Sequence, residues 1–151
     1  TAPERLEFEA EAAMRFEAAA AKACRGVYPV RISGAPPEGG PMEISFAPLV
    51  RAFVRDLEAG VPVPTVSARF HDSLAGLIVR VAERARRERG TEEVSLAGGV
   101  FLNRRLLGRT ERRLAARGFR VFRPLLYSPN DESLSLGQIA RGLAALKTGG
   151  A

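Results

Sequence analysis

The order of a short apolar strand, two consecutive glycines and a helix restricts the possible folds more than any other feature. Val94–Ala97 has the length and composition of a buried strand, and Gly98 and Gly99 follow it directly. Helical periodicity then runs over Phe101–Arg117, and a second strand is expected at Phe119–Phe122. Strands joined through a helix pair in parallel. The sequence therefore predicts an α/β fold with a short, mostly parallel sheet flanked by helices.

Hydrophobic periodicity predicts the remaining elements. An alanine-rich helix is expected at 8–24, and strands are expected at Tyr28–Ile32 and Met42–Phe46. A long helix is expected from Pro64 to Glu88. Its predicted apolar face consists of Val66, Phe70, Leu74, Leu77, Ile78 and Val81. Two more helices carry apolar faces made of Leu49, Val50, Phe53, Val54 and Leu57 and of Leu136, Ile139, Ala140, Leu143 and Leu146.

The chain of 151 residues has the length of one domain. We expect a single domain over 1–151, in which 1–63 is an N-terminal helix and linker region and 64–151 is the α/β half. The single Cys24 cannot form an intramolecular disulfide, and the single His71 cannot build a Cys/His zinc site. We expect Cys24 to fill core space and His71 to make structural hydrogen bonds. No apolar run approaches the ~20 residues of a membrane span, so a cytoplasmic protein without membrane contact is expected.

Arginine dominates the net charge of +6, since of 23 lysines and arginines only Lys22 and Lys147 are lysines. The stretch Arg104–Arg123 holds eight arginines against one acid, Glu111. Its helical arginines share one side, as on any solvated face: Arg105, Arg109, Arg112 and Arg113. Nucleic-acid binding is disfavoured, because it calls for exposed aromatic side chains beside the basic groups. Docking of an acidic domain on this face remains an alternative.

Two segments are candidates for a binding site. Gly98 and Gly99 let a ligand approach the backbone, and the N-terminus of the following helix attracts phosphate. Asn103, expected one turn into that helix, is placed to bond a ribose or a base. Asn130 and Asp131 stand where a helix N-cap belongs, and Asp131 is alternatively a metal ligand. An ordinary turn and an ordinary cap remain the competing interpretations.

Four motifs together resemble one enzyme family. Ser95–Asn103 reads SLAGGVFLN and resembles the LSGGVFxN signature of the hydrogenase-maturation carbamoyltransferases. Ser128–Gln138 is similar to their PPNDGGLALGQ. Ala68–His71 matches their ARFH, and Phe8–Met14 resembles their YEGQAAM. The motifs occur in the family's order and span almost the whole chain.

The resemblance implies the C-terminal lobe of a module with the actin/Hsp70/sugar-kinase (ribonuclease-H-like) architecture, shared with the tRNA threonylcarbamoyl-adenosine synthases and O-carbamoyltransferases. It implies that carbamoyl-adenylate or ATP binds between two lobes with a divalent metal ion. The carbamoyl group would pass to the C-terminal cysteine of a maturation protein, on the route to the cyanide ligands of nickel–iron hydrogenase. The implied partners are the preceding lobe and domains of the same protein and this carbamoyl acceptor.

The same resemblance implies roles for single residues. Gly98, Gly99 and Val100 would line the nucleotide, Asn103 would contact it, and Asp131 would ligate the metal. Paired histidines of the preceding lobe would complete the metal site. No residue is implied as a general base.

The chain departs from the family pattern at several positions. Ala10 stands in place of a glycine, Arg15 in place of an acid and Ala97 in place of a serine, and Glu132-Ser133 replaces two glycines. Two alternatives therefore stay open. One is a sister O-carbamoyl- or tRNA threonylcarbamoyltransferase, although Phe101 and the ARFH motif favour the hydrogenase type. The other is a non-catalytic binding module with a decayed nucleotide site.

Overall fold

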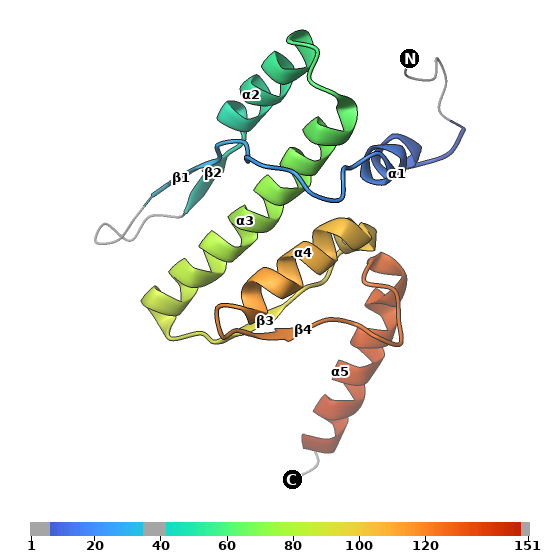
Figure 1. Ribbon diagram of the computed structural model, residues 1–151. Helices are drawn as coiled ribbons and strands as arrows, with labels where there is room; N and C mark the ends of the chain where they lie inside the picture. The colour runs from blue at the N-terminus through green and yellow to red at the C-terminus, as the bar shows by residue number, and fades with distance from the viewer. Residues whose placement is uncertain (1–6, 35–41, 149–151) are drawn as a thin grey trace. The chain divides into compact units, whose positions relative to one another are not determined.

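A computed structural model describes residues 7–34 and 42–148 of the chain (Figure 1). The chain divides into two compact units, Thr1–Val81 and Ala82–Ala151. Helix α3 (Val63–Arg89) contributes its first part to one unit and its last part to the other. The single domain expected for 1–151, with its halves meeting at residue 63, stays a prediction.

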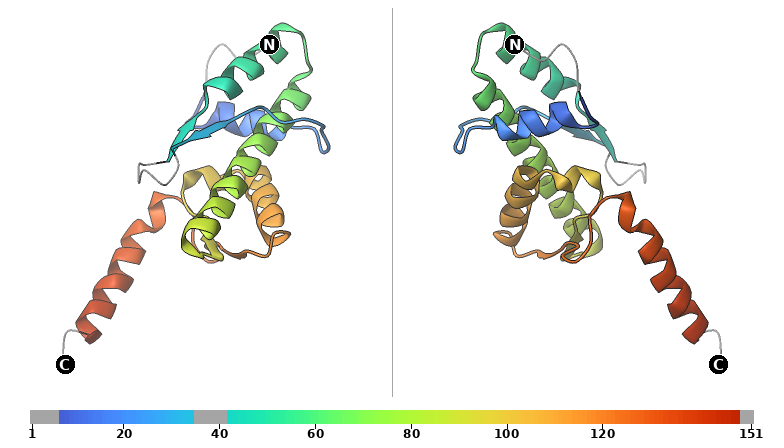
Figure 2. Two further views of the ribbon diagram at one scale, coloured as in Figure 1. Left: turned by 90° about the vertical axis from the view of Figure 1, so that its left-hand side faces the viewer. Right: turned by 90° about the vertical axis from the view of Figure 1, so that its right-hand side faces the viewer.

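The first unit contains α1 (Glu11–Ala18), the strands β1 (Arg31–Ser33) and β2 (Glu43–Ser45), and α2 (Ala47–Glu58). Strands β1 and β2 pair antiparallel, with Ile32 opposite Ile44. Figure 2 shows α2 and the start of α3 as neighbouring helices joined by a short turn. That turn includes Gly60, whose φ of 72° ends α2.

The core of the first unit lies between the segment before β1, helix α2 and helix α3. Its buried members are Tyr28, Val30, Leu49 and Leu77, and Ile32, Ala52, Phe53, Phe70, Leu74 and Val81 pack against them. Phe53 contacts Phe16 and Phe70 edge-to-face, with ring centroids 5.9 and 6.0 Å apart. These contacts confirm the apolar face predicted for α3 and, on α2, the inward positions of Leu49 and Phe53. The prediction for the other members of the α2 face is wrong, because Val50, Val54 and Leu57 are exposed.

Helix α3 is buried on more sides than its periodicity predicts. Ala68, Ala75 and Val79 are buried as well as the expected Val66 and Leu77. His71 is buried, its Nδ1 lies 2.7 Å from the carbonyl oxygen of Ser67, and its ring stacks on Phe16. The structural role predicted for His71 is confirmed.

Helix α1 is shorter than the predicted 8–24 and ends at Ala18. Cys24 therefore lies beyond the helix, half-buried, with its Sγ 3.7 Å from the carbonyl oxygen of Thr65. Ala10 precedes α1 in the left-handed conformation, with φ 63°. Among the described residues it is the one non-glycine residue with positive φ.

Replacing Ala10 by glycine is expected to raise the free energy of unfolding by about 0.5–1 kcal/mol. A left-handed alanine costs about 1–2 kcal/mol, and the larger unfolded-state freedom of glycine offsets part of the gain. Ala13→Gly inside α1 is the matched control and is expected to lose about 1 kcal/mol. Urea unfolding of the two variants measures both effects, and a loss of stability in Ala10→Gly would contradict the prediction.

The second unit contains β3 (Glu93–Ser95), the 3-10 turn η1 (Gly99–Leu102), α4 (Arg104–Ala115), β4 (Arg120–Phe122), the 3-10 turn η2 (Asp131–Ser133) and α5 (Leu134–Thr148). Strands β3 and β4 pair in parallel, with Val94 opposite Val121. Leu106, Thr110 and Leu114 form the buried stripe of α4. The predicted parallel pairing across a helix is confirmed.

The prediction of one mostly parallel sheet is corrected. The described residues form two separate two-stranded sheets, and the β1–β2 sheet is antiparallel. A direct hairpin connection allows antiparallel pairing, whereas the β3–β4 connection contains a helix.

The apolar residues of α5 are all exposed, although the pattern predicts a buried face. Leu136 is 40% exposed, Ile139 60%, Leu143 56% and Leu146 77%. The preceding loop exposes Leu125, Leu126 and Tyr127. Within the described residues, no helix has the length and apolar character needed to cross a membrane.

Candidate functional site

The two glycines lie at the carboxyl end of β3, where open α/β sheets bind ligands. Gly98 has φ 103° and ψ 153°, a backbone conformation that is almost exclusive to glycine. Its N–H donates to the carbonyl oxygen of Pro129 at 2.6 Å. A Cβ on Gly99 would lie 3.7 Å from the Cβ of Asn130. The structure thus brings the Gly98–Gly99 turn and the Pro129–Asp131 loop together.

Asn103 is the N-cap of α4, so its expected position one turn into a helix is wrong. Its Oδ1 accepts a hydrogen bond from the N–H of Leu106 at 2.8 Å. The residues before it, Gly99–Leu102, form a 3-10 turn instead of the first turn of the helix. An asparagine side chain satisfies the first unpaired N–H groups of a helix and so moves the helix start to Arg104.

Asn130, and not Asp131, makes the cap in the second motif. The Oδ1 of Asn130 accepts from the N–H of Glu132 at 3.3 Å. The Ser133 hydroxyl adds a bond to the carbonyl oxygen of Ser128 at 2.7 Å. Asp131 is exposed, and its carboxylate has no hydrogen bond or ion pair to a described residue. Its carboxylate is therefore available to a ligand.

Apolar surface lies beside the glycine turn. Val100 is 57% exposed on η1. A pocket of about 330 Å³ opens between η1, the start of α4 and the loop after β4. Its lining consists of Leu96, Phe101, Leu102, Leu107, Pro124 and Pro129 together with Arg104 and Arg123. Apolar walls with a few charged groups are typical of small-molecule sites.

The described residues do not provide a complete metal centre. Within them, no three His, Cys, Asp or Glu side chains gather in a group that could hold an ion. Asp131 fits as one oxygen ligand, because its carboxylate is exposed and uncommitted. The role of Asp131 as a metal ligand stays a prediction.

Arg15, which stands where the family pattern has an acid, makes a structural contact. Arg15 forms an ion pair with Glu11, whose side chain is almost fully buried. The N–H of Glu7 donates to Glu11 Oε2 at 2.6 Å and, more than the Arg15 ion pair, holds the pKa of Glu11 below its usual value. Glu11 is thus engaged in structural contacts, and Arg15 is engaged with Glu11. Neither residue offers a free carboxylate in place of the acid that the family pattern has after Met14.

The arginine-rich stretch is less solvated than predicted. Arg105, Arg109 and Arg113 are half-buried, and only Arg112 of the predicted face is exposed. Arg117, Arg120 and Arg123 pair with acids at 2.7, 2.7 and 2.5 Å, namely Glu83, Glu93 and Glu111. Phe119 is buried under the guanidinium of Arg86, whereas Phe122 is 46% exposed and has the guanidinium of Arg120 over its ring. Several of these arginines therefore serve local structure.

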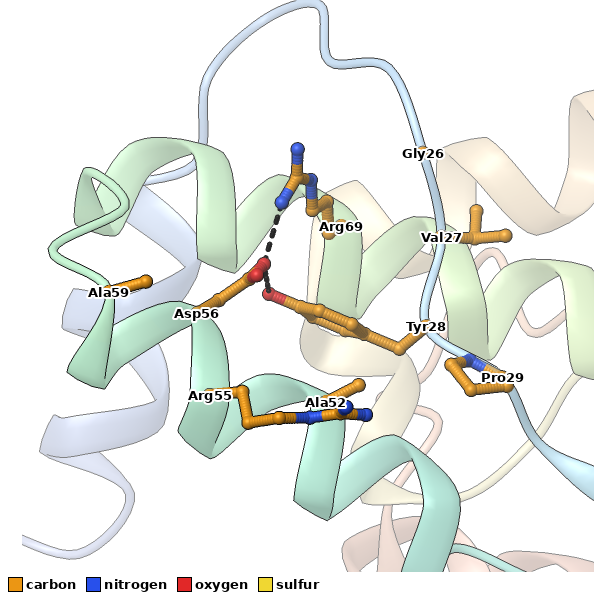
Figure 3. A pocket seen from close by; sticks show the side chains of 9 residues that line it. All are labelled: Gly26, Val27, Tyr28, Pro29, Ala52, Arg55, Asp56, Ala59 and Arg69. Atoms are coloured by element: carbon orange, nitrogen blue, oxygen red, sulfur yellow. Dashed lines mark hydrogen bonds and ion pairs between the residues drawn. The ribbon is translucent and has the colours of Figure 1, made fainter.

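Tyr28, Asp56 and Arg69 form a cluster that was not predicted from the sequence (Figure 3). Tyr28 donates its hydroxyl to Asp56 Oδ2 at 2.7 Å, and Arg69 donates to the same oxygen at 2.6 Å. The sequence did contain a signal, because Asp56 follows Leu49 and Phe53 at the spacing of the buried face of α2. A charged residue at such a position needs a partner.

Comparison with known proteins identifies the family to which this chain is related. A family model described as carbamoyltransferase, Kae1-like domain, second subdomain, matches residues 2–138. The carbamoyltransferase HypF of Synechocystis sp. is 28% identical over 139 residues, which is 91% of this chain and 17% of that protein. The tRNA N6-adenosine threonylcarbamoyltransferase of Parasynechococcus marenigrum is 36% identical over 104 residues, which is 65% of this chain and 29% of that protein.

A solved structure agrees with these sequence matches. The crystal structure of full-length HypF in its phosphate- and nucleotide-bound form has a TM-score of 0.82 at 30% identity, covering 89% of this chain and 17% of that one. The likeness confirms the expected α/β lobe. The chain spans about one sixth of the length of these HypF relatives. It belongs to the carbamoyltransferase family, in which it corresponds to the second subdomain of the Kae1-like domain.

Proposed function

We propose that the chain is the C-terminal lobe of a cytoplasmic carbamoyltransferase of the hydrogenase-maturation type, with the actin/Hsp70/sugar-kinase architecture. The lobe binds carbamoyl-adenylate or ATP with a divalent metal ion. The carbamoyl group then passes to the C-terminal cysteine of a maturation protein. The family match over 2–138 and the likeness to HypF support this proposal.

One observation carries the proposal, the hydrogen bond from Gly98 N–H to the carbonyl oxygen of Pro129. It holds the backbone that a nucleotide would approach next to the loop that presents Asp131. Phosphate-binding backbone and a carboxylate ligand then lie on the same side of the strands. This placement is what an adenylate with a bound cation requires.

The residues of this lobe would act by binding and orientation. Gly98 and Gly99 admit the phosphate and ribose to the backbone, and Val100 offers apolar surface to the base. Asn103 would use atoms other than Oδ1, since that oxygen caps α4. A metal ion held by Asp131 would supply positive charge beside the phosphate. When the acceptor thiolate attacks the carbamoyl carbon, the bond to the AMP oxygen breaks, and fixed N–H groups stabilise the charge that forms.

The exposed apolar face of α5 supports the proposal that the complete protein has a second lobe. Four large apolar side chains of α5 are between 40% and 77% exposed at helical spacing. A soluble protein normally covers such a patch. We propose that the preceding lobe of the same protein covers it and contributes the histidines of the metal site.

The tRNA threonylcarbamoyltransferases remain the second candidate. The 36% identity to the Parasynechococcus marenigrum enzyme over 104 residues favours this reading. Carbamoyl transfer to a peptide with a C-terminal cysteine separates the two candidates, because the tRNA enzyme has no use for a thiol acceptor. A non-catalytic module would bind neither nucleotide nor acceptor.

Replacing Asp131 by asparagine in the complete protein is expected to weaken metal-dependent ATP binding by about tenfold or more. The variant keeps the side-chain shape but loses the negative charge that a cation needs. Glu132→Gln is the matched control, because it removes the same charge from the next residue, which is also exposed. Calorimetry with ATP and a divalent cation measures both variants.

The comparison of the two variants decides the proposal. An unchanged affinity in Asp131→Asn, or an equal loss in Glu132→Gln, would remove Asp131 from the site. Absence of any ATP binding by the unmodified complete protein would reject the enzyme and favour the non-catalytic module.

A further inference from the structure

A second pocket lies in the first unit, between α2 and the extended segment that precedes β1 (Figure 3). Its volume is about 420 Å³, within the range of small-molecule sites. The Gly26–Pro29 segment, which includes Tyr28, lines one side, Asp56 is its acidic residue, and Arg55 and Arg69 are its cationic residues. None of these residues belongs to the glycine turn or to the Asp131 loop.

Tyr28, Asp56 and Arg69 form a fixed hydrogen-bonded cluster in the lining of this pocket. Asp56 Oδ2 accepts from both the Tyr28 hydroxyl and Arg69. These two hydrogen bonds hold the pKa of Asp56 below its usual value, and the bond from Tyr28 has the larger effect. Burial and the bond to Asp56 raise the pKa of Tyr28, so its proton stays in place. The cluster therefore keeps one arrangement and one charge state near neutral pH.

The Arg55 side chain is the uncommitted group of the pocket. Its Nε donates to the carbonyl oxygen of Arg51 at 3.4 Å, and its terminal nitrogens have no hydrogen bond or ion pair to a described residue. In the view of Figure 3, Arg55 and Arg69 lie on opposite sides of Asp56 and Tyr28. Two guanidiniums against one carboxylate leave the pocket with an excess positive charge. Arg69 is held by Asp56, whereas Arg55 is exposed, lies near enough to Asp56 to help lower the pKa of that carboxyl, and keeps its terminal nitrogens for a ligand.

We propose that this pocket binds a small ligand through a terminal oxyanion, a carboxylate or a phosphate, held by the terminal nitrogens of Arg55. A guanidinium presents two parallel N–H groups that match either oxyanion. The fixed Arg69–Asp56–Tyr28 cluster supplies a rigid wall, so little is lost in ordering the site. The site is independent of the nucleotide site and does not rest on the proposed carbamoyl transfer.

Arginine footprinting on the complete protein tests the proposal. Phenylglyoxal modifies accessible guanidiniums, and peptide mass spectrometry compares Arg55 with Arg51. Arg51 is exposed on the same helix but does not line this pocket. The probes are N-acetylglycine, its uncharged amide and inorganic phosphate. N-acetylglycine or phosphate is expected to slow modification of Arg55 selectively, and the amide is expected to have no effect.

Binding measurements on two variants complete the test. Arg55→Gln is expected to weaken binding of the effective probe by about tenfold, the value of one charge-assisted hydrogen bond. Arg51→Gln is expected to leave it unchanged. Protection by N-acetylglycine alone identifies a carboxylate ligand, and protection by phosphate alone identifies a phosphate. Equal protection of Arg51 and Arg55, protection by the amide, or equal losses in the two variants would overturn the proposal.

Discussion

Replacing Leu49 by alanine is expected to lower the free energy of unfolding by about 2–5 kcal/mol. Leu49 is 2% exposed and packs with Tyr28, Val30 and Leu77 in the core of the first unit. Truncation removes apolar contacts and leaves a cavity that the neighbouring rings cannot fill without leaving their edge-to-face arrangement. Urea unfolding followed by circular dichroism measures the change.

Leu57→Ala is the matched control for this prediction, because it makes the same change on the same helix. Leu57 is 44% exposed, so it has little burial to lose. Leucine and alanine are both good helix formers, and the control is expected to cost less than about 1 kcal/mol. Similar losses in the two variants would mean that α2 is not packed as the structure has it.

The C-terminal half could be predicted because its signals are local. Glycines at both ends of a periodic segment and short apolar runs define β3, α4 and β4 without any knowledge of the tertiary structure. Parallel pairing of β3 and β4 then follows from the helical connection. The same reasoning wrongly predicted a single sheet for all four strands, because no local signal indicates which strands pair with each other.

Neither the end of α1 nor the start of α4 could be predicted, and the physical reason differs between the two helices. Alanine-rich sequence has high helix propensity as far as Cys24, but α1 ends at Ala18, since propensity alone does not hold a short helix. In α4 the apolar periodicity continues through η1, and the capping bond of Asn103 decides the start. An asparagine after an apolar residue is compatible with a cap or with an interior position.

The candidate site was predictable in its parts and not in its assembly. Gly98, Gly99 and Asp131 stand out in the sequence, but the bond from Gly98 to Pro129 joins segments that only the fold brings together. The Tyr28–Asp56–Arg69 cluster needs three separate segments to meet. Side-chain partners at such separations follow from tertiary packing, for which a single sequence carries no local signal.

Replacing Gly98 by alanine is expected to reduce carbamoyl transfer by the complete protein about a hundredfold. The φ and ψ of Gly98, 103° and 153°, cost a side-chain-bearing residue about 1–3 kcal/mol. No atom crowds the position, so the strain lies in the backbone itself. The chain relaxes by rotating the Gly98 N–H away from Pro129, and displacements of about 1 Å at a reaction site cost about a hundredfold in rate.

Gly99→Ala is the control that separates backbone conformation from the space that the glycine pair leaves. Gly99 has no positive φ, and its Cβ would make an ordinary 3.7 Å contact with Asn130. If the first glycine serves the backbone and the second only borders the loop, Gly98→Ala loses activity and Gly99→Ala retains most of it. The opposite order would show that a ligand lies against Gly99 so closely that a methyl group excludes it. The two variants add the same methyl group at neighbouring positions. The ratio of their carbamoyl-transfer rates therefore reports which glycine the site depends on.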